Sequence, residues 1–286
     1  MNSYFKPSPY RVSTITCNGS IGKNVGEVYL DLLFQVIPII SLMDDKYGFV
    51  YMIDKQGKDF KGILPKKEKK TQKGPITTEE QFKKRRFDNA ISGYFKLKEN
   101  YFPSVKIFKN GTIQMTGVKT IEDGELLNSK IYQVIKSISL EHPTIVKDSS
   151  KIECGEFCVR LINSDFSINY NIRRKDLHHL LISDMYNNIS SFQPGTYPGV
   201  KLQYFWNKNS KNHNGICECS EKCFGKGIGD GDGKCKKITV SIFESGKILI
   251  TGAIQFQQIN EAYSYICNIL QQHQSALQKV IKINTA

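Results

Sequence analysis

Apolar and polar side chains alternate along two stretches of the chain, and each stretch is interrupted by one turn signal. The first stretch, residues 104–118, turns at Asn110-Gly111 and has apolar residues at every second position: Val105, Ile107, Ile113 and Met115. The second, residues 236–253, turns at Ser245-Gly246 and repeats the pattern: Ile238, Val240, Ile242, Ile248 and Ile250. Because side chains alternate across a strand, each stretch predicts a β-hairpin with one apolar and one mixed face.

A helical pattern follows each hairpin. The apolar residues after the first hairpin are spaced three and four apart: Leu127, Ile131, Val134, Ile135 and Ile138. Those after the second hairpin follow the same spacing: Ile259, Tyr263, Ile266 and Leu270. The spacing predicts two amphipathic helices, and these are the natural cover for the apolar faces of the hairpins.

The two hairpins are copies of one motif. The segment 108–118 returns 135 residues later as 243–253, with Phe, Gly, Ile, Thr and Gly at the same positions and no gap. Such a recurrence indicates an internal duplication. We therefore expect one pseudo-symmetric domain of two repeats, residues 1–147 and 148–286, with enough chain to bury a substantial core.

A segment before the second hairpin carries a family resemblance. Residues 190–200 read Ser-Ser-Phe-Gln-Pro-Gly-Thr-Tyr-Pro-Gly-Val, and Phe192 to Gly199 is similar, without a gap, to the stirrup of the second repeat in the TATA-box-binding protein family. In that family a hairpin like the one at Phe243 follows the stirrup. The two repeats cover residues 11–278, and the size and insertions resemble divergent members found in large DNA viruses.

The resemblance implies an α+β fold in which the two repeats form one curved antiparallel sheet, a saddle, with helices on the convex face. Family members press the concave face into the DNA minor groove, where four Phe side chains wedge between base steps and bend the duplex. It thus implies a monomeric initiation factor with double-stranded DNA, general transcription factors and RNA polymerase as partners. Its implied location is the nucleus, a viral factory in the host cytoplasm, or the virion.

Site residues follow from the same resemblance. Phe108 and Phe243 match one wedge in each half, with Tyr197 and Phe87 as their partners. The positions that match the floor of the sheet, where base edges are contacted, are Gln114, Thr116, Leu249, Thr251, Asn163, Arg11 and Ser13. From the burial habits of Phe alone, Phe108 and Phe243 are equally compatible with packing over the turn into the core.

The chain departs from the family in two places. Family members carry an Asn near the centre of each half, whereas Arg11 and Leu161 stand at the matching positions here, with Asn163 two residues further on. A preference for A·T pairs needs well-placed minor-groove contacts, so it is in doubt. The stirrup has Gln193 and Gly195 in place of two glutamates that help to hold the B-type general factor. These departures favour a second hypothesis, a protein-interaction scaffold of a transcription complex that has lost TATA-specific binding.

Composition adds limits to both hypotheses. The net charge of +13 is concentrated in two insertions, residues 54–86 with +7 and residues 207–237 with +3. The first is either a solvated charged loop or a flank that contacts phosphates or an acidic partner. Apolar runs are too short to span a membrane and no signal peptide is apparent, so we expect a soluble intracellular protein. No catalytic constellation lies on the repeated frame, so we expect no enzyme.

The second insertion holds half of the eight cysteines: Cys217, Cys219, Cys223 and Cys235. Four thiolates can form a tetrahedral zinc site, although the spacing Cys-x-Cys-x-x-x-Cys is not that of a paired zinc knuckle. Reduced thiols are the second interpretation. Disulfides are the third interpretation. Secretion would favour disulfides, and nothing in the chain indicates secretion. The remaining cysteines are expected to be ordinary core or surface residues, and no cofactor other than this zinc ion is indicated.

Overall fold

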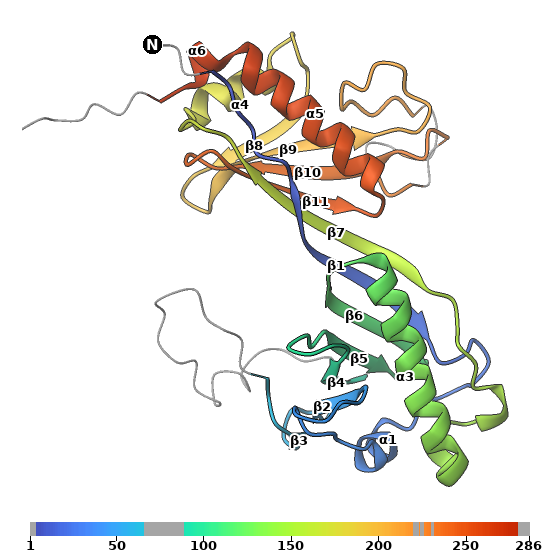
Figure 1. Ribbon diagram of the computed structural model, residues 1–286. Coiled ribbons are helices and arrows are strands. Elements are labelled where there is room, and N and C mark those ends of the chain that lie inside the picture. Colours follow the sequence, from blue (N-terminus) through green and yellow to red (C-terminus); the bar gives the residue numbers. More distant parts are fainter. Residues whose placement is uncertain (1–3, 66–88, 220–222, 224–225, 230–231, 280–286) are drawn as a thin grey trace, which may run out of the picture. The chain divides into compact units, whose positions relative to one another are not determined.

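The structure is a computed structural model that describes residues 4–65, 89–219, 223, 226–229 and 232–279 (Figure 1). Its helices and strands occur in the order β1 (Arg11–Ser20), α1 (Leu30–Val36), β2 (Gly48–Ile53), β3 (Phe60–Gly62), β4 (Ala90–Lys96), β5 (Ser104–Phe108), β6 (Thr112–Val118), α3 (Ile121–Glu141), β7 (Cys158–Ser167), α4 (Arg174–Ile182), β8 (Ile189–Gln193), β9 (Tyr197–Trp206), β10 (Lys236–Ile242), β11 (Lys247–Ala253), α5 (Phe256–Gln272) and α6 (Gln274–Leu277). The fold is therefore α+β.

The eleven strands among the described residues form one open sheet in the order β3-β2-β4-β5-β6-β1-β7-β11-β10-β9-β8. Within each repeat, neighbouring strands pair antiparallel, including the two hairpins that the sequence predicts, β5–β6 and β10–β11. Contacts divide the chain into two compact units, one of residues 15–160 and the other of residues 1–14 with 161–286. Residues 4–14 thus pack with the second repeat.

The unit of residues 15–160 buries the apolar face of its hairpin beneath α3, which runs across the strands (Figure 1). Val105, Ile107, Ile113 and Met115 are all at most 1% exposed. They meet helix residues that repeat at every turn and are equally buried: Leu127, Ile131 and Ile135. The helix begins at the N-cap Thr120, whose Oγ1 accepts a hydrogen bond from the backbone N–H of Asp123 at 3.0 Å.

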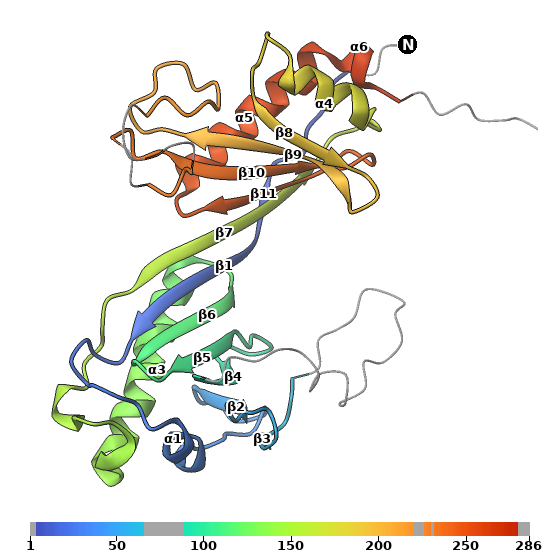
Figure 2. The same ribbon diagram turned by 180° about the vertical axis from the view of Figure 1, so that it is seen from behind.

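The other unit repeats this arrangement with α5 and α4 on one face of β8–β11, as the view from behind also shows (Figure 2). Every apolar residue predicted for the inner face is fully buried: Ile238, Val240, Ile242, Ile248 and Ile250. Each such side chain contributes about 1.5–3 kcal/mol of transfer free energy. The predicted alternation, and with it the two-repeat core, is confirmed in both units.

The repeated Thr-Gly pair has a structural reason. Gly117 and Gly252 have φ angles of +80° and +95°, values that favour glycine. At these residues β6 and β11 carry an extra residue relative to their partner strands, so that the pairing shifts between Ile15 and Thr16 in one unit and between Ile250 and Ala253 in the other. Each Thr-Gly therefore marks a β-bulge at the same place in both repeats.

The predicted basic insertion lies partly outside the described residues, and the predicted wedge residue Phe87 lies wholly outside them. The range 54–86 assigned to the basic insertion includes strand β3, which pairs with β2 through Tyr51 and Gly62, so its first part belongs to the sheet. The lysine cluster of residues 66–70 and Phe87 lie outside the described residues. Among the described helices, none combines the length and the apolar character needed to cross a membrane.

Candidate nucleic-acid interface and cysteine cluster

The sheet face opposite the helices carries the residues that the sequence assigns to DNA contact. Phe108, Gln114 and Thr116 in one unit are partly exposed, and each directly follows a fully buried residue of the opposite face. The same holds for Phe243, Leu249 and Thr251 in the other unit, where β11 alternates in the same way, and Tyr197 is partly exposed as well. The two Phe rings therefore do not belong to the core, and the open face is available for a ligand. Their role in DNA binding stays a prediction.

Tyr197 and Phe243 form a pair although 46 residues separate them in sequence. Tyr197 begins β9 and Phe243 follows the last residue of β10, and their ring centroids lie 5.8 Å apart with planes tilted by 57°. Gly199 makes room for both rings, because a Cβ there would lie 2.9 Å from Tyr197 Cε1 and 3.2 Å from Phe243 Cε1. Lys201 Nζ lies 4.2 Å from the centre of the Tyr197 ring.

A second aromatic residue of the β8–β9 hairpin, Phe192, lies on the opposite side of the sheet. Phe192 packs on the helix side, with its ring centroid 6.4 Å from that of His178 and the Arg174 guanidinium 5.4 Å from its centre. Arg174 also pairs with Glu244 at 2.8 Å, and Glu244 receives a second cation, Lys279, at 2.6 Å. The hydrogen bond from Lys279 is the largest of the effects that lower the pKa of Glu244.

The floor of this open face contains one strongly charged pair. Asp165 lies opposite Leu249 in the β7–β11 register, so the two side chains share a face. Its carboxylate accepts from Arg11 Nε at 3.0 Å, and its side chain is 11% exposed against 74% for Arg11. Ser13 Oγ donates to the backbone carbonyl of Asn163 at 3.0 Å. The buried Oδ1 of Asn163 has no hydrogen-bond partner among the described residues.

In the other unit, the floor of the open face pairs an Arg with an amide instead of a carboxylate. Asn18 lies opposite Gln114, and Gln114 lies opposite Lys106 on the next strand. With its amide oriented to satisfy both partners, Asn18 accepts a hydrogen bond from Arg160 Nε at 3.2 Å. Burial lowers the pKa of Lys106. Thr116 completes the floor, opposite Thr16.

Strand pairing assigns equivalent residues differently from the sequence comparison. Ile15 pairs with Val118 and Ile162 pairs with Ala253, at matching ends of the two motif copies. Ile15 and Ile162 are therefore equivalent, which makes Asn18 and Asp165 equivalent as well. The resemblance instead aligned Arg11 with Leu161, three residues out of step with this pairing. Sequence analysis consequently missed Asn18, Asp165 and Arg160, because nothing local in the sequence reports which strand position faces Gln114 or Leu249.

The four cysteines of the second insertion come together as one cluster. Their Sγ atoms all lie within 4.8 Å of one another, and those of Cys217 and Cys223 are 3.5 Å apart. Cys223 and Cys235 are fully buried against Phe205 of β9, while Cys217 and Cys219 are half-buried at the edge of the same cluster. All four are free thiols. His213, also in this insertion, bonds elsewhere.

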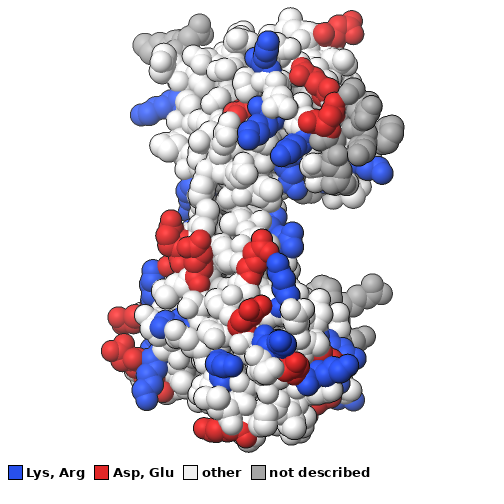
Figure 3. All heavy atoms as spheres, turned by 90° about the vertical axis from the view of Figure 1, so that its right-hand side faces the viewer, with Lys and Arg blue, Asp and Glu red and all other residues white. Residues whose placement is uncertain are grey.

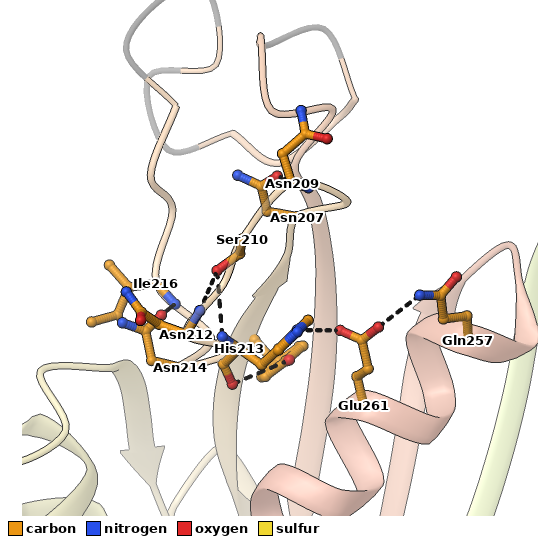
Figure 4. Close-up of polar contacts among 10 residues, drawn as sticks. Asn207, Asn209, Ser210, Asn212, His213, Asn214, Ile216, Gln257 and Glu261 are labelled. Carbon is orange, nitrogen blue, oxygen red and sulfur yellow. Dashed lines mark hydrogen bonds and ion pairs between the residues drawn. The ribbon is translucent and has the colours of Figure 1, made fainter.

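A second contact ties the insertion to the helices (Figure 4). His213 Nδ1 lies 2.9 Å from Glu261 Oε2 of α5, and the other Glu261 oxygen accepts from Gln257 Nε2 at 3.0 Å. Short-range turns shape the preceding loop, with Ser210 Oγ accepting from the backbone N–H of Asn212 at 3.3 Å. Beside this contact, on the helix side, is a cavity of about 710 Å³ bounded by His213, Glu261 and Tyr186. This cavity is therefore separate from the open sheet face.

The charged surface is mixed. On the face shown in Figure 3, basic and acidic side chains are interspersed over the sheet units. Several of the cations there and elsewhere are paired, including Lys109 with Glu27 at 2.9 Å and Lys98 with Asp123 at 2.5 Å. The net charge of +13 is thus not a measure of cations available to a ligand.

The fold and its open face define an internally duplicated α+β protein with paired aromatic residues on the exposed side of an antiparallel sheet. Residues 232–273, which contain β10, β11 and α5, match the family described as transcription factor TFIID, or TATA-binding protein. A TATA-box-binding protein-like protein of Acanthamoeba polyphaga mimivirus is 27% identical over 220 residues, covering 71% of this chain and 51% of that protein. TATA-box-binding protein 2 of Entamoeba histolytica is 23% identical over 190 residues, covering 66% and 67%.

The chain is thus similar to members of the TATA-box-binding protein family, including one of a large DNA virus. Among solved structures it is similar to the Methanococcus jannaschii TATA-binding protein, with 14% identity, a TM-score of 0.49 and coverage of 93% of this chain and 99% of that one. The chain spans about half the length of the mimivirus protein, at 51%.

Proposed function

We propose that the protein is a transcription initiation factor that binds double-stranded DNA in the minor groove through the open faces of its sheet and bends the duplex. The observation that carries this proposal is the Tyr197–Phe243 pair, with ring centroids 5.8 Å apart on the half-exposed face. Two large rings side by side at the end of a sheet, opposite the helices, form a wedge. General transcription factors and RNA polymerase are the partners that this role requires.

The physical chemistry of the face suits such a ligand. Partial unstacking of a base step costs a few kcal/mol, and contact between a widened minor groove and the sheet floor recovers this cost. Two side chains of the floor beside the wedge, Leu249 and Thr251, are uncharged and allow close approach of base edges. Lys201, whose ammonium lies over the Tyr197 ring, is placed to meet a phosphate at the edge of the groove.

The proposal is tested by measuring bend rather than affinity alone. Donor and acceptor dyes at the two ends of a short A·T-rich duplex report its end-to-end distance, which wild-type protein is expected to shorten. The double substitution Tyr197→Ala/Phe243→Ala removes both rings and is expected to abolish most of this change. Phe192→Ala is the matched control, because it removes a ring from the same hairpin on the helix side and is expected to leave the bend unchanged.

One observation favours the scaffold as a second candidate function. Asp165 places a carboxylate on the open face, where a phosphate backbone would be repelled. If wild-type protein leaves the duplex straight, or if Phe192→Ala reduces the bend as much as the double substitution does, the wedge mechanism is wrong. The open face would then serve protein contacts within a transcription complex.

A further inference from the structure

The cysteine cluster has the composition and the size of a closed tetrahedral metal site. Four sulfurs at about 2.3 Å from a zinc ion lie about 3.8 Å from one another. The four Sγ atoms here all lie within 4.8 Å of each other, and Cys217 and Cys223 are at 3.5 Å. A disulfide needs about 2.05 Å between sulfurs, so none of these contacts is a covalent bond.

The surroundings of the sulfurs match those of a structural site. Cys223 and Cys235 are fully buried and contact Phe205, so that two of the four ligands are shielded from water. The backbone N–H of Gly227 donates to Cys223 Sγ at 3.3 Å, which is the kind of contact that stabilises a metal-bound thiolate. With four sulfur ligands and no position left for water, such a site is structural rather than catalytic.

The cluster lies where a bound metal would hold the insertion against the ends of β9 and β10. Cys235 immediately precedes β10, and Phe205 belongs to β9, so the cluster closes the insertion onto the ends of two paired strands. Around it the backbone adds further bonds, from Lys237 N to the Gly227 carbonyl at 2.8 Å and from Gly229 N to the Cys235 carbonyl at 3.0 Å. The insertion is rich in glycine and polar residues, and such a segment buries too little apolar surface to order itself.

We propose that Cys217, Cys219, Cys223 and Cys235 bind one zinc ion that orders the insertion between β9 and β10. The ion would join Cys217, Cys219 and Cys223 to Cys235, which immediately precedes β10, and its binding free energy would become folding free energy of this segment. The site is independent of DNA binding, since its residues lie outside the open-face residues assigned to DNA contact.

The test is the metal content and thermal stability of the full chain. Protein purified without chelator in reducing buffer is expected to hold about one zinc ion per chain by elemental analysis. Cys217→Ser/Cys235→Ser is expected to lose the metal and to melt at a lower temperature. Cys154→Ser is the matched control, because it removes an exposed thiol outside the cluster and is expected to keep the zinc.

A second measurement covers the case in which the double variant does not fold. Wild-type protein stripped with a chelator and titrated with Co²⁺ is expected to develop the visible absorption of a tetrahedral thiolate complex, which added Zn²⁺ then removes. Metal-free protein that gains neither cobalt absorption nor melting temperature on addition of either ion would overturn the proposal. Peptide mapping that finds a disulfide among the four cysteines in freshly purified protein would overturn it as well.

Discussion

The two repeats place an Arg beside a polar side chain at the same point of their open faces, but that side chain is an amide in one and a carboxylate in the other. Asn18 lies opposite Gln114 and accepts from Arg160. Asp165 lies opposite Leu249 and accepts from Arg11. Since the surrounding strands and bulges correspond, the difference lies in the chemistry of one position and not in the frame.

This difference separates what the two faces can offer to a duplex. An amide can donate to the acceptors that A·T pairs present in the minor groove, whereas an ionised carboxylate can only accept. The guanine amino group is the one donor that the minor groove presents. The carboxylate also carries a charge of the same sign as the phosphates. The frame is thus nearly symmetric, while the repeat with Asn18 and Gln114 is the better suited to A·T pairs.

The largest effect is expected from making the two positions alike. Asp165→Asn removes a negative charge from the proposed interface and frees the Arg11 guanidinium, so affinity for an A·T-rich duplex should rise about tenfold, or about 1.4 kcal/mol. If Arg11 then contacts a phosphate, the slope of log affinity against log salt should steepen by about 0.9. Fluorescence anisotropy at several salt concentrations measures both quantities.

The reverse change, Asn18→Asp, should weaken binding by a similar factor, because it adds a charge to the repeat that has none at this position. Asp176→Asn is the control for Asp165→Asn, since it makes the same change in net charge on α4, away from the open face. An equal gain in affinity from Asp176→Asn would mean that overall charge, and not the position on the open face, accounts for the result.

An intermediate effect is expected from disturbing the aromatic pair of one repeat without removing it. In Gly199→Ala the new Cβ would lie 2.9 Å from Tyr197 Cε1, so the rings must shift from their observed positions. The dye-labelled duplex should then bend less, with a smaller loss than the double ring deletion causes. Gly195→Ala lies in the same hairpin with nothing within 4 Å of its Cβ, and it should bend DNA like wild type. Equal behaviour of the two variants would show that the ring geometry is irrelevant to bending.

The smallest effect is expected from replacing Gln114, the floor residue that lies opposite Asn18. Gln114→Leu should reduce the preference for A·T-rich over G·C-rich duplexes about threefold, less than the ~1–3 kcal/mol of a good bidentate base contact. Gln133→Leu on the exposed side of α3 is the control for a change of hydrophobicity. If Gln114→Leu leaves the preference for A·T-rich duplexes unaltered, the first repeat does not contribute to the discrimination between A·T and G·C pairs.

Local patterns in the sequence were sufficient for the two hairpins, the two helices that cover them and the duplication. The alternation around Asn110-Gly111 predicted which side chains of β5 and β6 are buried, because the two-residue period of a strand is a property of the local backbone. The copy at Phe243 followed the same parity, but the burial habits of Phe left packing into the core as an equal alternative, and the structure placed this residue on the open face. The stirrup resemblance identified Tyr197 as a candidate, and the structure placed its ring beside that of Phe243.

Relations between distant segments were decided only by the tertiary structure. The register of β1 on β6 and of β7 on β11 made Asn18 and Asp165 equivalent, whereas sequence comparison had aligned Arg11 with Leu161. The bulges at Gly117 and Gly252 shift the register by one residue, and only the observed strand pairing shows which residues then lie opposite one another. The four cysteines form one cluster because the pairing of β9 with β10 brings Cys235 back to the others. Alternation is determined within a few residues of chain, but register and clustering depend on hydrogen bonds between strands that no local pattern encodes.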